Sequence, residues 1–540
     1  MDREAGRRSY VYGRKGRSAL TCAWRQAAIA EHATYIGNHA VSALLDIERA
    51  FDSVDHDLLR RQAVVHRYDM NILRFLINMY GMKRIIMVER VVTKPVVATR
   101  SIVPGDSNAD TLMLLCMLSP CDAIIHRFPE MHIALLADDI QLLHVAERSE
   151  DCALKMAQAS SCIIEELENV CLLTVKTSKL VIASNSKPTA DRVGLRYRRL
   201  QGTFKRTVRN LGVDFAAGGR VIRKVQNDRL KTASIKSLRM RRIVQAGAQT
   251  KKLLRPAILS GATYGVEVMG MLPSRLARLR TDCHRAVSRN PKARSATIEL
   301  QLDDREHDPA FGVKINPILY FLTAIWDCIL PRTLLLRAFS TAVHNVSVKR
   351  WRDVIGPFSA AAHSIVDCGW SFVPGKLLTW KDQHGTMIEV GDLAPRAVAK
   401  MLADSLQERL WNSMLHASTT FGNIRGVPWL TPIRRLLRAQ DTDDWNQRHK
   451  NMLRCLASTG IWSLERLKCA GYRTDGLCKY CGAPQTLHHI LWECEAVGNT
   501  VAQRRELPDV ILHLPQNRPD WALWTTGTAK FDLRVPTHDR

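Results

Sequence analysis

The chain has 540 residues, of which 46% are apolar, and it carries a formal net charge of +26. The apolar content excludes a disordered tail, and the length exceeds what one core supports, so we expect two to four domains. The excess of Lys and Arg favours a polyanionic partner. A basic membrane-surface protein is the alternative, but the sequence shows no amphipathic basic helix and no lipidation motif.

The sequence also bears on the cellular compartment. The first residues, MDREAGRRSYVYGRKGRS, lack the apolar core of a signal peptide. The longest apolar stretch, TLMLLCML, is shorter than a membrane span requires. We therefore expect an intracellular protein without a transmembrane segment. Its 14 cysteines are then free thiols or metal ligands rather than a disulfide framework.

Hydrophobic periodicity predicts a mixed α+β unit up to about residue 215. Its expected elements are a helix at 20–35, a strand at 40–45, a helical stretch at 56–80, a hairpin at 84–102, an apolar helix at 109–128, two short strands at 132–145, an amphipathic helix at 149–170 and a strand at 179–184. Residues 220–295 then read as helical and strongly basic, and residues 300–455 as mostly helical.

Carboxylates follow two of the predicted strands. Asp46 ends the run AVSALL, and Asp138 and Asp139 form the turn of ALLADDIQLL. A single Asp after a strand is usually a turn or helix-cap residue. If the two strands are neighbours in one sheet, however, their carboxylates converge and repel each other unless a cation holds them. Magnesium binds carboxylates together with substrate phosphates, and a pair of such ions serves nucleotidyl transfer.

These stretches resemble a known family. LLDIERAFDSVDHDLL is similar to the first catalytic motif of reverse transcriptases from non-LTR retrotransposons, and LLADDIQLL resembles their catalytic YADD hairpin. The order of motifs is also similar. VYGRKGRSALTCAW resembles the end of the fingers, RSIVPGDSNADTLMLLCML lies where the family has a Q-G-D-P-L-S-P loop, LLTVKTSKLVIAS resembles the lysine-bearing strand, and NLGVDF resembles the primer-grip region.

The resemblance implies an α+β right-hand polymerase fold. The activity it implies is an RNA-directed DNA polymerase that extends a DNA primer with dNTPs on an RNA template, using two Mg²⁺ ions. Asp46 and Asp138 would be the principal magnesium ligands, with Asp139 beside them as a third catalytic carboxylate. The backbone carbonyl of Ile47 would be an additional metal ligand.

The resemblance also implies substrate-binding residues. Phe51 occupies the position of the steric gate, where a bulky ring leaves no room for the 2′-hydroxyl of a ribonucleotide. Lys179 matches a lysine that lies near the phosphates or donates a proton, and Gly105 belongs to the template-contacting loop. Arg14 or Arg17 would touch the triphosphate. Without the motif, Phe51 would be an ordinary core residue and Lys179 a surface lysine.

Several positions depart from the family pattern. Leu136 replaces the tyrosine of YADD, Pro104 replaces the glutamine before Gly105, DSNAD replaces D-P-L-S-P, and Lys176 replaces an asparagine; the chain also begins after the first finger motifs. These departures favour a second hypothesis, an inactive remnant that only binds nucleic acid. The intact carboxylates favour the enzyme. A palm-fold nucleotide cyclase is a third hypothesis, and the basic helical segment argues against it.

A cysteine cluster is the second strong signal. In CKYCGAPQTLHHILWEC, the residues Cys478, Cys481, His489 and Cys494 have the spacing C-x2-C-x7-H-x4-C, and His488 is an alternative ligand. Zinc is held tetrahedrally by thiolates and imidazoles, commonly by a CxxC pair closed by a more distant His and Cys. The sequence therefore predicts a zinc site. It resembles the zinc knuckle of site-specific non-LTR elements that carry a restriction-like endonuclease.

The expected domains follow from these motifs. They are partial fingers at 1–38, a reverse transcriptase palm at 39–215, a helical basic thumb at 216–300, a helical linker at 301–455, a CCHC zinc knuckle at 456–500 and a truncated start of an endonuclease-like domain at 501–540. In the last, Asp520, Asp532 and Arg534 resemble the start of a PD…D-x-K site. A nuclear location is expected for such a protein.

Overall fold

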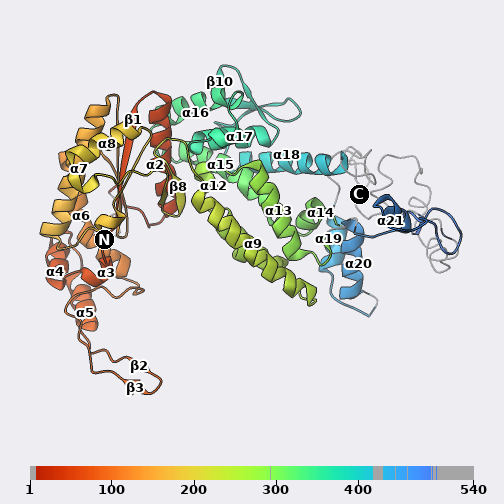
Figure 1. The fold of residues 1–540 in the computed structure, drawn as a ribbon, viewed down its shortest axis with the longest axis horizontal. Helices are drawn as coiled ribbons and strands as arrows, with labels where there is room; N and C mark the ends of the chain where they lie inside the picture. The colour runs from red at the N-terminus through yellow and green to blue at the C-terminus, as the bar shows by residue number, and fades with distance from the viewer. Residues whose placement is uncertain are drawn as a thin grey trace. The chain divides into compact units, whose positions relative to one another are not determined.

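The computed structural model describes residues 8–291, 294–416, 430–443, 445–458, 460–487, 489–490 and 494 (Figure 1). The chain is mixed α+β with small sheets, and it divides into two compact units. Unit 1 comprises Met1–Asn227, Gly265–Gly270 and Tyr320–His363. Unit 2 comprises Asp228–Tyr264, Met271–Leu319 and Ser364–Arg540. The endonuclease-like segment at 501–540 lies outside the described residues.

Unit 1 is built around one four-stranded sheet. Its main elements in chain order are α2 (Ala19–Tyr35), β1 (His39–Leu45), α3 (Ala50–Ser53), α4 (His56–Val65), α5 (Met70–Tyr80), β2 (Met87–Val88), β3 (Val91–Val92), α6 (Ala109–Arg127), β4 (His132–Leu136), β5 (Asp139–Ala146), α7 (Ser149–Glu165), β6 (Val181–Ser184), α8 (Lys187–Arg196), β7 (Val208–Asn210), β8 (Val213–Phe215), α12 (Val266–Met269), α16 (Arg332–Val346) and α17 (Pro357–Asp367).

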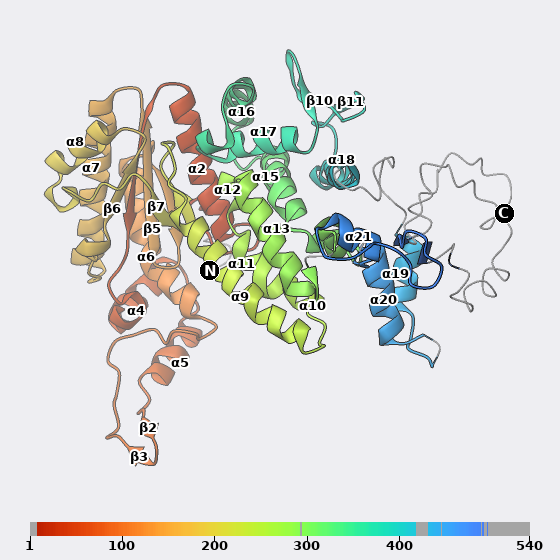
Figure 2. The same cartoon turned by 45° about the vertical axis from the view of Figure 1, so that its right-hand side comes forward.

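The sheet has the strand order β4-β5-β1-β6, and each neighbouring pair is antiparallel. Helix α7 packs on one face of β1 and β5, and α2 packs on the other, as Figures 1 and 2 show. Because both faces are covered, the central strand β1 is buried along most of its length and reads as a continuous apolar run. The expected strands at 40–45, 132–145 and 179–184 are therefore all members of one sheet.

Helix α6 is the core helix of unit 1. Leu112 to Leu118 are all buried, so the helix is apolar around its circumference rather than along one stripe. By length and composition it could cross a membrane, and it alone passes that test among the residues that the structure describes. Of its most apolar window, 61% is buried inside the structure, as in any core helix of this length.

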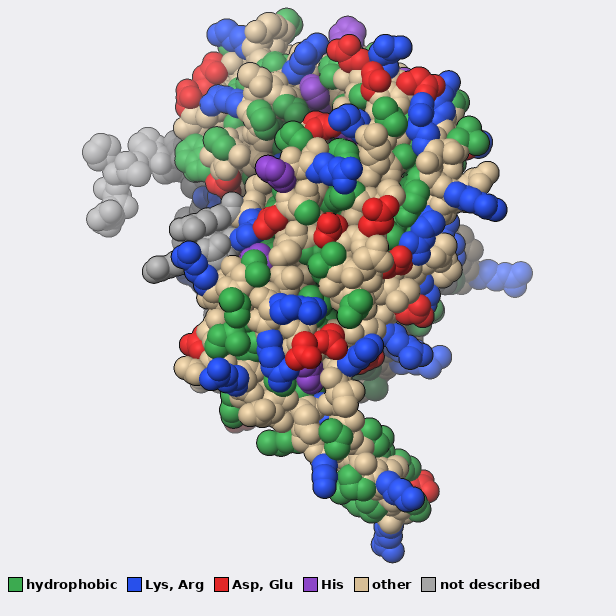
Figure 3. Space-filling model, turned by 90° about the vertical axis from the view of Figure 1, so that its left-hand side faces the viewer, with side chains coloured by type: hydrophobic (Ala, Val, Ile, Leu, Met, Phe, Trp, Pro, Cys, Tyr) green, Lys and Arg blue, Asp and Glu red, His purple; other side chains and the backbone are tan. Residues whose placement is uncertain are grey.

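Two expected elements differ in detail from the structure. The helical stretch at 56–80 is two helices, because Asp69 caps α5 by accepting hydrogen bonds from the backbone of Asn71 and Ile72. The hairpin expected at 84–102 has the regular pair β2–β3 with its turn at Glu89 and Arg90, and its arms pair again at the antiparallel bridge between Arg84 and Val96. Its apolar and basic side chains are exposed, and Figure 3 shows them gathered on the projection at the bottom of that view.

A buried carboxylate joins α2 to α17 within unit 1. Glu31 accepts hydrogen bonds from the backbone N–H groups of Phe358 (2.7 Å) and Ser359 (2.9 Å) and from the hydroxyls of Ser359 and Tyr35. It thereby caps the N-terminus of α17, where a negative charge is favourable. The approach requires Gly356, because a Cβ there would lie 2.5 Å from a carboxylate oxygen of Glu31.

Unit 2 is mainly helical. Its elements are most of α9 (Lys224–Gln245), α10 (Lys251–Leu254), α11 (Ser260–Ala262), α13 (Pro273–Val287), α14 (Ala296–Gln301), the first part of α15 (Pro309–Trp326), β9 (Ser371–Val373), β10 (Lys376–Lys381), β11 (Met387–Glu389), α18 (Pro395–His416), α19 (Thr431–Arg438), α20 (Gln447–Ala457) and α21 (Leu464–Cys469). The three-stranded sheet β11-β10-β9 was not expected, because its strands are short and follow a turn signal rather than an alternating pattern.

Replacing Glu31 with Ala is expected to lower the free energy of unfolding of unit 1 by about 3 kcal/mol, because two buried N–H donors of α17 lose their acceptor. Urea unfolding followed by tryptophan fluorescence measures the change. The matched control is Glu165→Ala, which removes an exposed glutamate at the end of α7. Equal midpoints for the two variants would contradict the capping role of Glu31.

Candidate functional site

The pairing of β1 with β5 brings the predicted acidic residues to one end of the sheet. Leu45 pairs with Ile140 in antiparallel register. Asp46 follows Leu45 in the chain and Asp139 precedes Ile140, so both residues lie next to the last pair of this ladder. The strands that carry these carboxylates are therefore neighbours, as their convergence requires.

Asp138 lies at the tip of the β4–β5 hairpin. Leu136 pairs with Asp139, so Ala137 and Asp138 alone make the turn. Ala137 has a φ of 53°, in the left-handed region that non-glycine residues seldom adopt. Such backbone strain persists where the surrounding structure imposes it, and here the ladders on both sides of β5 hold the turn in place.

The three carboxylates disfavour one another's charge. Partial burial, followed by the charges of Asp138 and Asp46, raises the pKa of Asp139 to about 6. Partial burial and the charge of Asp46 also raise the pKa of Asp138. A carboxyl whose pKa is raised in the folded state costs stability when it ionises, so the cost appears as the pH rises through about 6. Any cation that approached the cluster would reduce that cost.

Lys179 neutralises part of this charge. Its ammonium group forms an ion pair with Asp46, which raises the pKa of the lysine. Lys179 ends a short 3-10 helix (Thr177–Lys179) just before β6. The backbone before that helix also fixes Asp46, because the N–H of Lys176 donates to the Asp46 carbonyl at 2.9 Å. Ile47, which is buried, bridges to Val175 in the same segment.

A fourth carboxylate, which the sequence motifs do not mark, acts on this cluster. Asp110 lies in the first turn of α6, and its charge also raises the pKa of Asp138. An acidic residue in a first helical turn is ordinary, because it interacts favourably with the helix dipole. Only the three-dimensional arrangement shows that this one faces the hairpin.

The remaining predicted residues lie around this end of unit 1. Phe51, in α3, packs against the core of the unit, and its carbonyl accepts from the N–H of Ile102. Gly105 has a φ of +90° in the loop before α6. Arg14 pairs with Arg17 in a turn before α2, and a Cβ on its neighbour Gly13 would lie 3.1 Å from Leu136. The structure therefore places the Arg14 turn against the strand that leads into the acidic hairpin.

A pocket of about 280 Å³ opens beside Asp139. Leu136, Gln141, Cys22 and the β7–β8 turn with Asn210 line it. The side chain of Asn210 donates to Gln141 at 2.8 Å, and that of Gln141 donates to Ser42 at 3.1 Å. This buried polar chain ties the β7–β8 hairpin, which bears the NLGVDF motif, to the central strands of the sheet.

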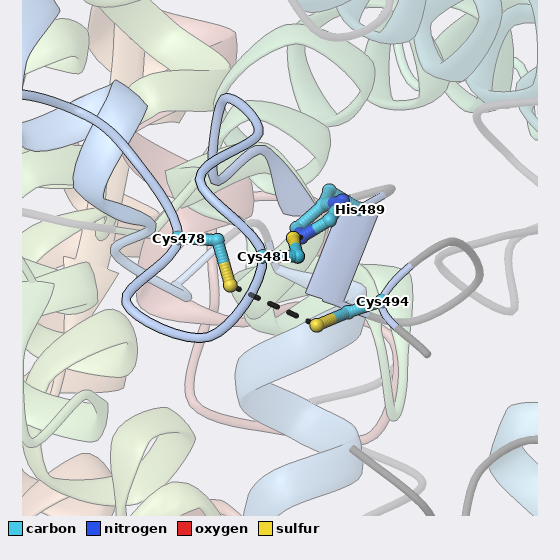
Figure 4. Close-up of side chains that lie close together, drawn as sticks. All are labelled: Cys478, Cys481, His489 and Cys494. Carbon is cyan, nitrogen blue, oxygen red and sulfur yellow. Dashed lines mark hydrogen bonds between the residues drawn. The ribbon is translucent and has the colours of Figure 1, made fainter. Parts of the chain in front are cut away.

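The predicted zinc ligands converge in unit 2. The ligand atoms of Cys478, Cys481, His489 and Cys494 all lie within 4.8 Å of one another, and Figure 4 shows their side chains pointing toward a common centre. Cys478 Sγ lies 3.7 Å from Cys494 Sγ, close to the about 3.8 Å that two thiolates span around tetrahedral zinc. Cys481 Sγ lies 3.1 Å from His489 Nε2. The donor set thus fits a metal such as zinc.

The surrounding backbone favours the thiolate form. The N–H groups of Tyr480 and Cys481 lower the pKa of Cys478 to about 6, with a further contribution from His489. A thiolate at neutral pH is what metal ligation requires. A hydrogen bond from Gly482 N–H to the Cys478 carbonyl closes the turn between the two cysteines. His488, the alternative ligand, lies outside the described residues.

The comparisons with known proteins give distant structural likeness alone. No family model matches the chain, and no curated protein matches it. Among solved structures, telomerase from Candida albicans in complex with a TWJ fragment of telomeric RNA is similar, with a TM-score of 0.31 and 11% sequence identity. The similarity covers 67% of this chain and only 56% of the telomerase chain, so it spans little more than half of that protein.

Replacing Cys481 with Ser is expected to lower zinc affinity at least about tenfold, because zinc loses one of four tetrahedral ligands. Metal content by mass spectrometry and hydrogen exchange of residues 470–487 measure the loss, while unit 1 should exchange as before. The control is Cys469→Ser, an exposed thiol outside the cluster. Native protein without zinc, or with these thiols paired as disulfides, would refute the metal site.

Proposed function

We propose that this chain is an RNA-directed DNA polymerase of a non-LTR retrotransposon. The observation that carries the proposal is the meeting of Asp46 with Asp138 and Asp139 at the end of two paired strands. The same two segments bear the motifs that resemble the family's catalytic centre. The third hypothesis, a palm-fold nucleotide cyclase, offers no reason for the basic helices or the cysteine cluster.

The carboxylates are proposed to hold the catalytic cations. Asp46, Asp138 and the carbonyl of Ile47 supply hard oxygen ligands, and Asp139 adds negative charge beside them. When bound, two Mg²⁺ ions would activate the primer 3′-hydroxyl and stabilise the departing pyrophosphate. The oxygen of the primer 3′-hydroxyl would lose its proton to solvent and form a bond to the α-phosphorus of a dNTP, while the bond between that phosphorus and the oxygen bridging to the β-phosphate would break.

Other residues of unit 1 are proposed to position the nucleotide. Lys179 would exchange its ion pair with Asp46 for the substrate phosphates, and it could donate the proton that the leaving pyrophosphate needs. Phe51 would exclude a 2′-hydroxyl, Gly105 would let the template backbone approach closely, and Arg14 would contact the triphosphate. These roles follow the family resemblance residue by residue.

The rest of the chain is proposed to hold nucleic acid. Residues 1–38 would form part of the fingers, 39–215 the palm and 216–300 the thumb. The thumb would track the phosphates of an RNA template and DNA primer largely without sequence preference. Residues 301–455 would be a linker to the zinc knuckle. Copying RNA into chromosomal DNA would place the protein in the nucleus.

A second candidate function is nucleic-acid binding without catalysis. Lys179 already neutralises Asp46, and Leu136 and Pro104 alter two substrate-facing positions of the family pattern. An inactive remnant would keep the basic surface and the knuckle while losing extension. Binding and extension therefore have to be measured on the same preparation.

Asp138→Asn is expected to abolish primer extension on an RNA template with dNTPs and Mg²⁺, because an amide is a much poorer magnesium ligand than a carboxylate. Binding of the primer-template should persist and should weaken with salt, since Lys and Arg provide it. A gel-based extension assay and fluorescence anisotropy measure the two properties. The control is Asp191→Asn, an exposed residue of α8.

Two outcomes separate the candidate functions. If the unmutated chain binds the primer-template but extends it with neither Mg²⁺ nor Mn²⁺, it is the non-catalytic protein. If Asp138→Asn extends as well as Asp191→Asn, the acidic cluster is not the catalytic site.

Phe51→Val is expected to lower the preference for dNTPs over rNTPs by more than about tenfold, because the smaller side chain leaves room for a 2′-hydroxyl. The ratio of kcat/KM values for the two nucleotides measures the preference. Phe75→Val, at an exposed position of α5, is the control. An unchanged ratio with dNTP extension retained would mean that Phe51 is only a packing residue.

A further inference from the structure

Unit 2 contains a basic pocket that none of the motifs accounts for. Its volume is about 540 Å³, within the range of small-ligand sites. It is lined by the segment between α9 and α10, the end of α13, and α14 and α20, all of which belong to unit 2. Figure 2 shows α10 and α20 on the same side of that unit.

The floor of the pocket is a buried network of charges. The side chains of Lys251, Arg294 and Arg454 are only 17%, 14% and 16% exposed. Lys251 and Arg294 contact Glu299 at 3.1 and 3.2 Å, while Lys251 and Arg454 contact Asp303 at 2.9 Å. Three cations therefore meet two carboxylates, which leaves one positive charge in surplus.

The rim adds two more cations. Arg289 and Arg448 line the pocket with exposed side chains. Within the described ranges, neither forms an ion pair or a side-chain hydrogen bond. A network with only a structural purpose would be expected to balance its charges, because an unpaired charge near low-dielectric protein is unfavourable. In this pocket the positive charge that no carboxylate balances increases from the floor to the opening.

One donor on the floor also lacks an acceptor. Nε of Arg294 is buried, and no acceptor for it exists among the residues that the structure describes. Buried polar groups are normally hydrogen-bonded, so this guanidinium donor still has capacity for an acceptor that a ligand would supply. Guanidinium groups suit phosphate especially well, since their fixed fork can donate two parallel hydrogen bonds.

We infer that this pocket binds a phosphate group, supplied either by a nucleoside polyphosphate or by the backbone of a nucleic-acid strand. Arg289 and Arg448 provide the charge at the opening, and Arg294 and Lys251 receive the phosphate oxygens on the floor. Val244 and Met452 give the pocket an apolar wall against which a sugar or base can lie. The pocket lies wholly in unit 2, so the inference does not depend on the acidic cluster of unit 1.

Cys455 provides a direct reporter of occupancy. It lines the pocket and is partly exposed, so a bound ligand should shield its thiol from N-ethylmaleimide. The full chain is treated with N-ethylmaleimide alone or in the presence of inorganic phosphate, ATP or a short oligo-dT strand. The extent of labelling of each cysteine is then measured by mass spectrometry of the peptides. The exposed Cys328 serves as an internal control.

The decisive variant is the double substitution Arg289→Gln and Arg448→Gln, which removes two side chains without ion pairs and so should not disturb folding. The affinity of this variant for the probe that protects Cys455 is expected to fall about tenfold or more, because charge-assisted hydrogen bonds to phosphate are lost. Arg278→Gln, at an exposed arginine of α13 outside the pocket, should behave like the unmutated chain.

The pattern of protection identifies the source of the phosphate. If ATP or inorganic phosphate protects Cys455 and the double variant loses that protection, the pocket binds a free nucleotide or phosphate. If oligo-dT alone protects Cys455, the pocket binds the backbone of a nucleic-acid strand. Cys455 labelling unaffected by all three probes, or protection that survives in the double variant, would overturn the inference. In the Asp138→Asn variant, the same probes should protect Cys455 as they do in the unmutated chain. The test of the pocket therefore stays valid even if the polymerase proposal fails.

Discussion

The antiparallel pairing of β1 with β5 determines where negative charge gathers in unit 1. Buried polar contacts support this register, because the Ser42 hydroxyl on β1 donates to the Leu142 carbonyl on β5 and accepts from the Gln141 side chain, and a slip would leave these groups unpaired. The same register that satisfies the core places Asp46 beside Asp139 and leaves Asp138 at the hairpin tip. Packing energy therefore holds carboxylates together that would otherwise separate, and the cost shows in the raised pKa values of Asp138 and Asp139. Lys179 offsets part of that cost, and a divalent cation would offset more.

Local patterns in the sequence were sufficient for much of this arrangement. The alternation and apolar runs identified the strands and the core helix α6, and the cysteine spacing identified four ligands that the fold brings within 4.8 Å. What could not be predicted depends on long-range packing. Asp110 reads as an ordinary first-turn residue until α6 is packed against the hairpin, and Glu31 reads as an exposed helical residue until α17 meets it. The strands β9 and β11 have three residues each, too few for a period of two to show, and β10 carries no regular alternation of apolar and polar residues.

The large positive charge is used in two different ways within unit 2. Some cations form ion pairs with buried carboxylates. Arg280 donates two hydrogen bonds to the fully buried Asp308, which also accepts a hydrogen bond from Gln301. Other cations outnumber the carboxylates around them, and these line the pocket that has Arg289 and Arg448 at its rim. Composition alone predicts an anionic partner but not where it binds. The location follows from comparing the cations of each cluster with the carboxylates that face them.

The proposed metal binding and the proposed substrate positioning depend on different features of unit 1. The carboxylates are placed by backbone register, which a substitution at a neighbouring side chain does not change. Leu136 instead points its side chain toward Gly13 and the pocket beside Asp139, and Pro104 lies in a loop whose left-handed Gly105 is retained. The departures from the family pattern therefore fall on residues that would touch nucleotide or template, while every proposed metal ligand is kept. A chain altered in this way would be expected to retain cation binding even if it extended a primer slowly, because weakened substrate contacts act on KM and kcat without displacing the metal ligands.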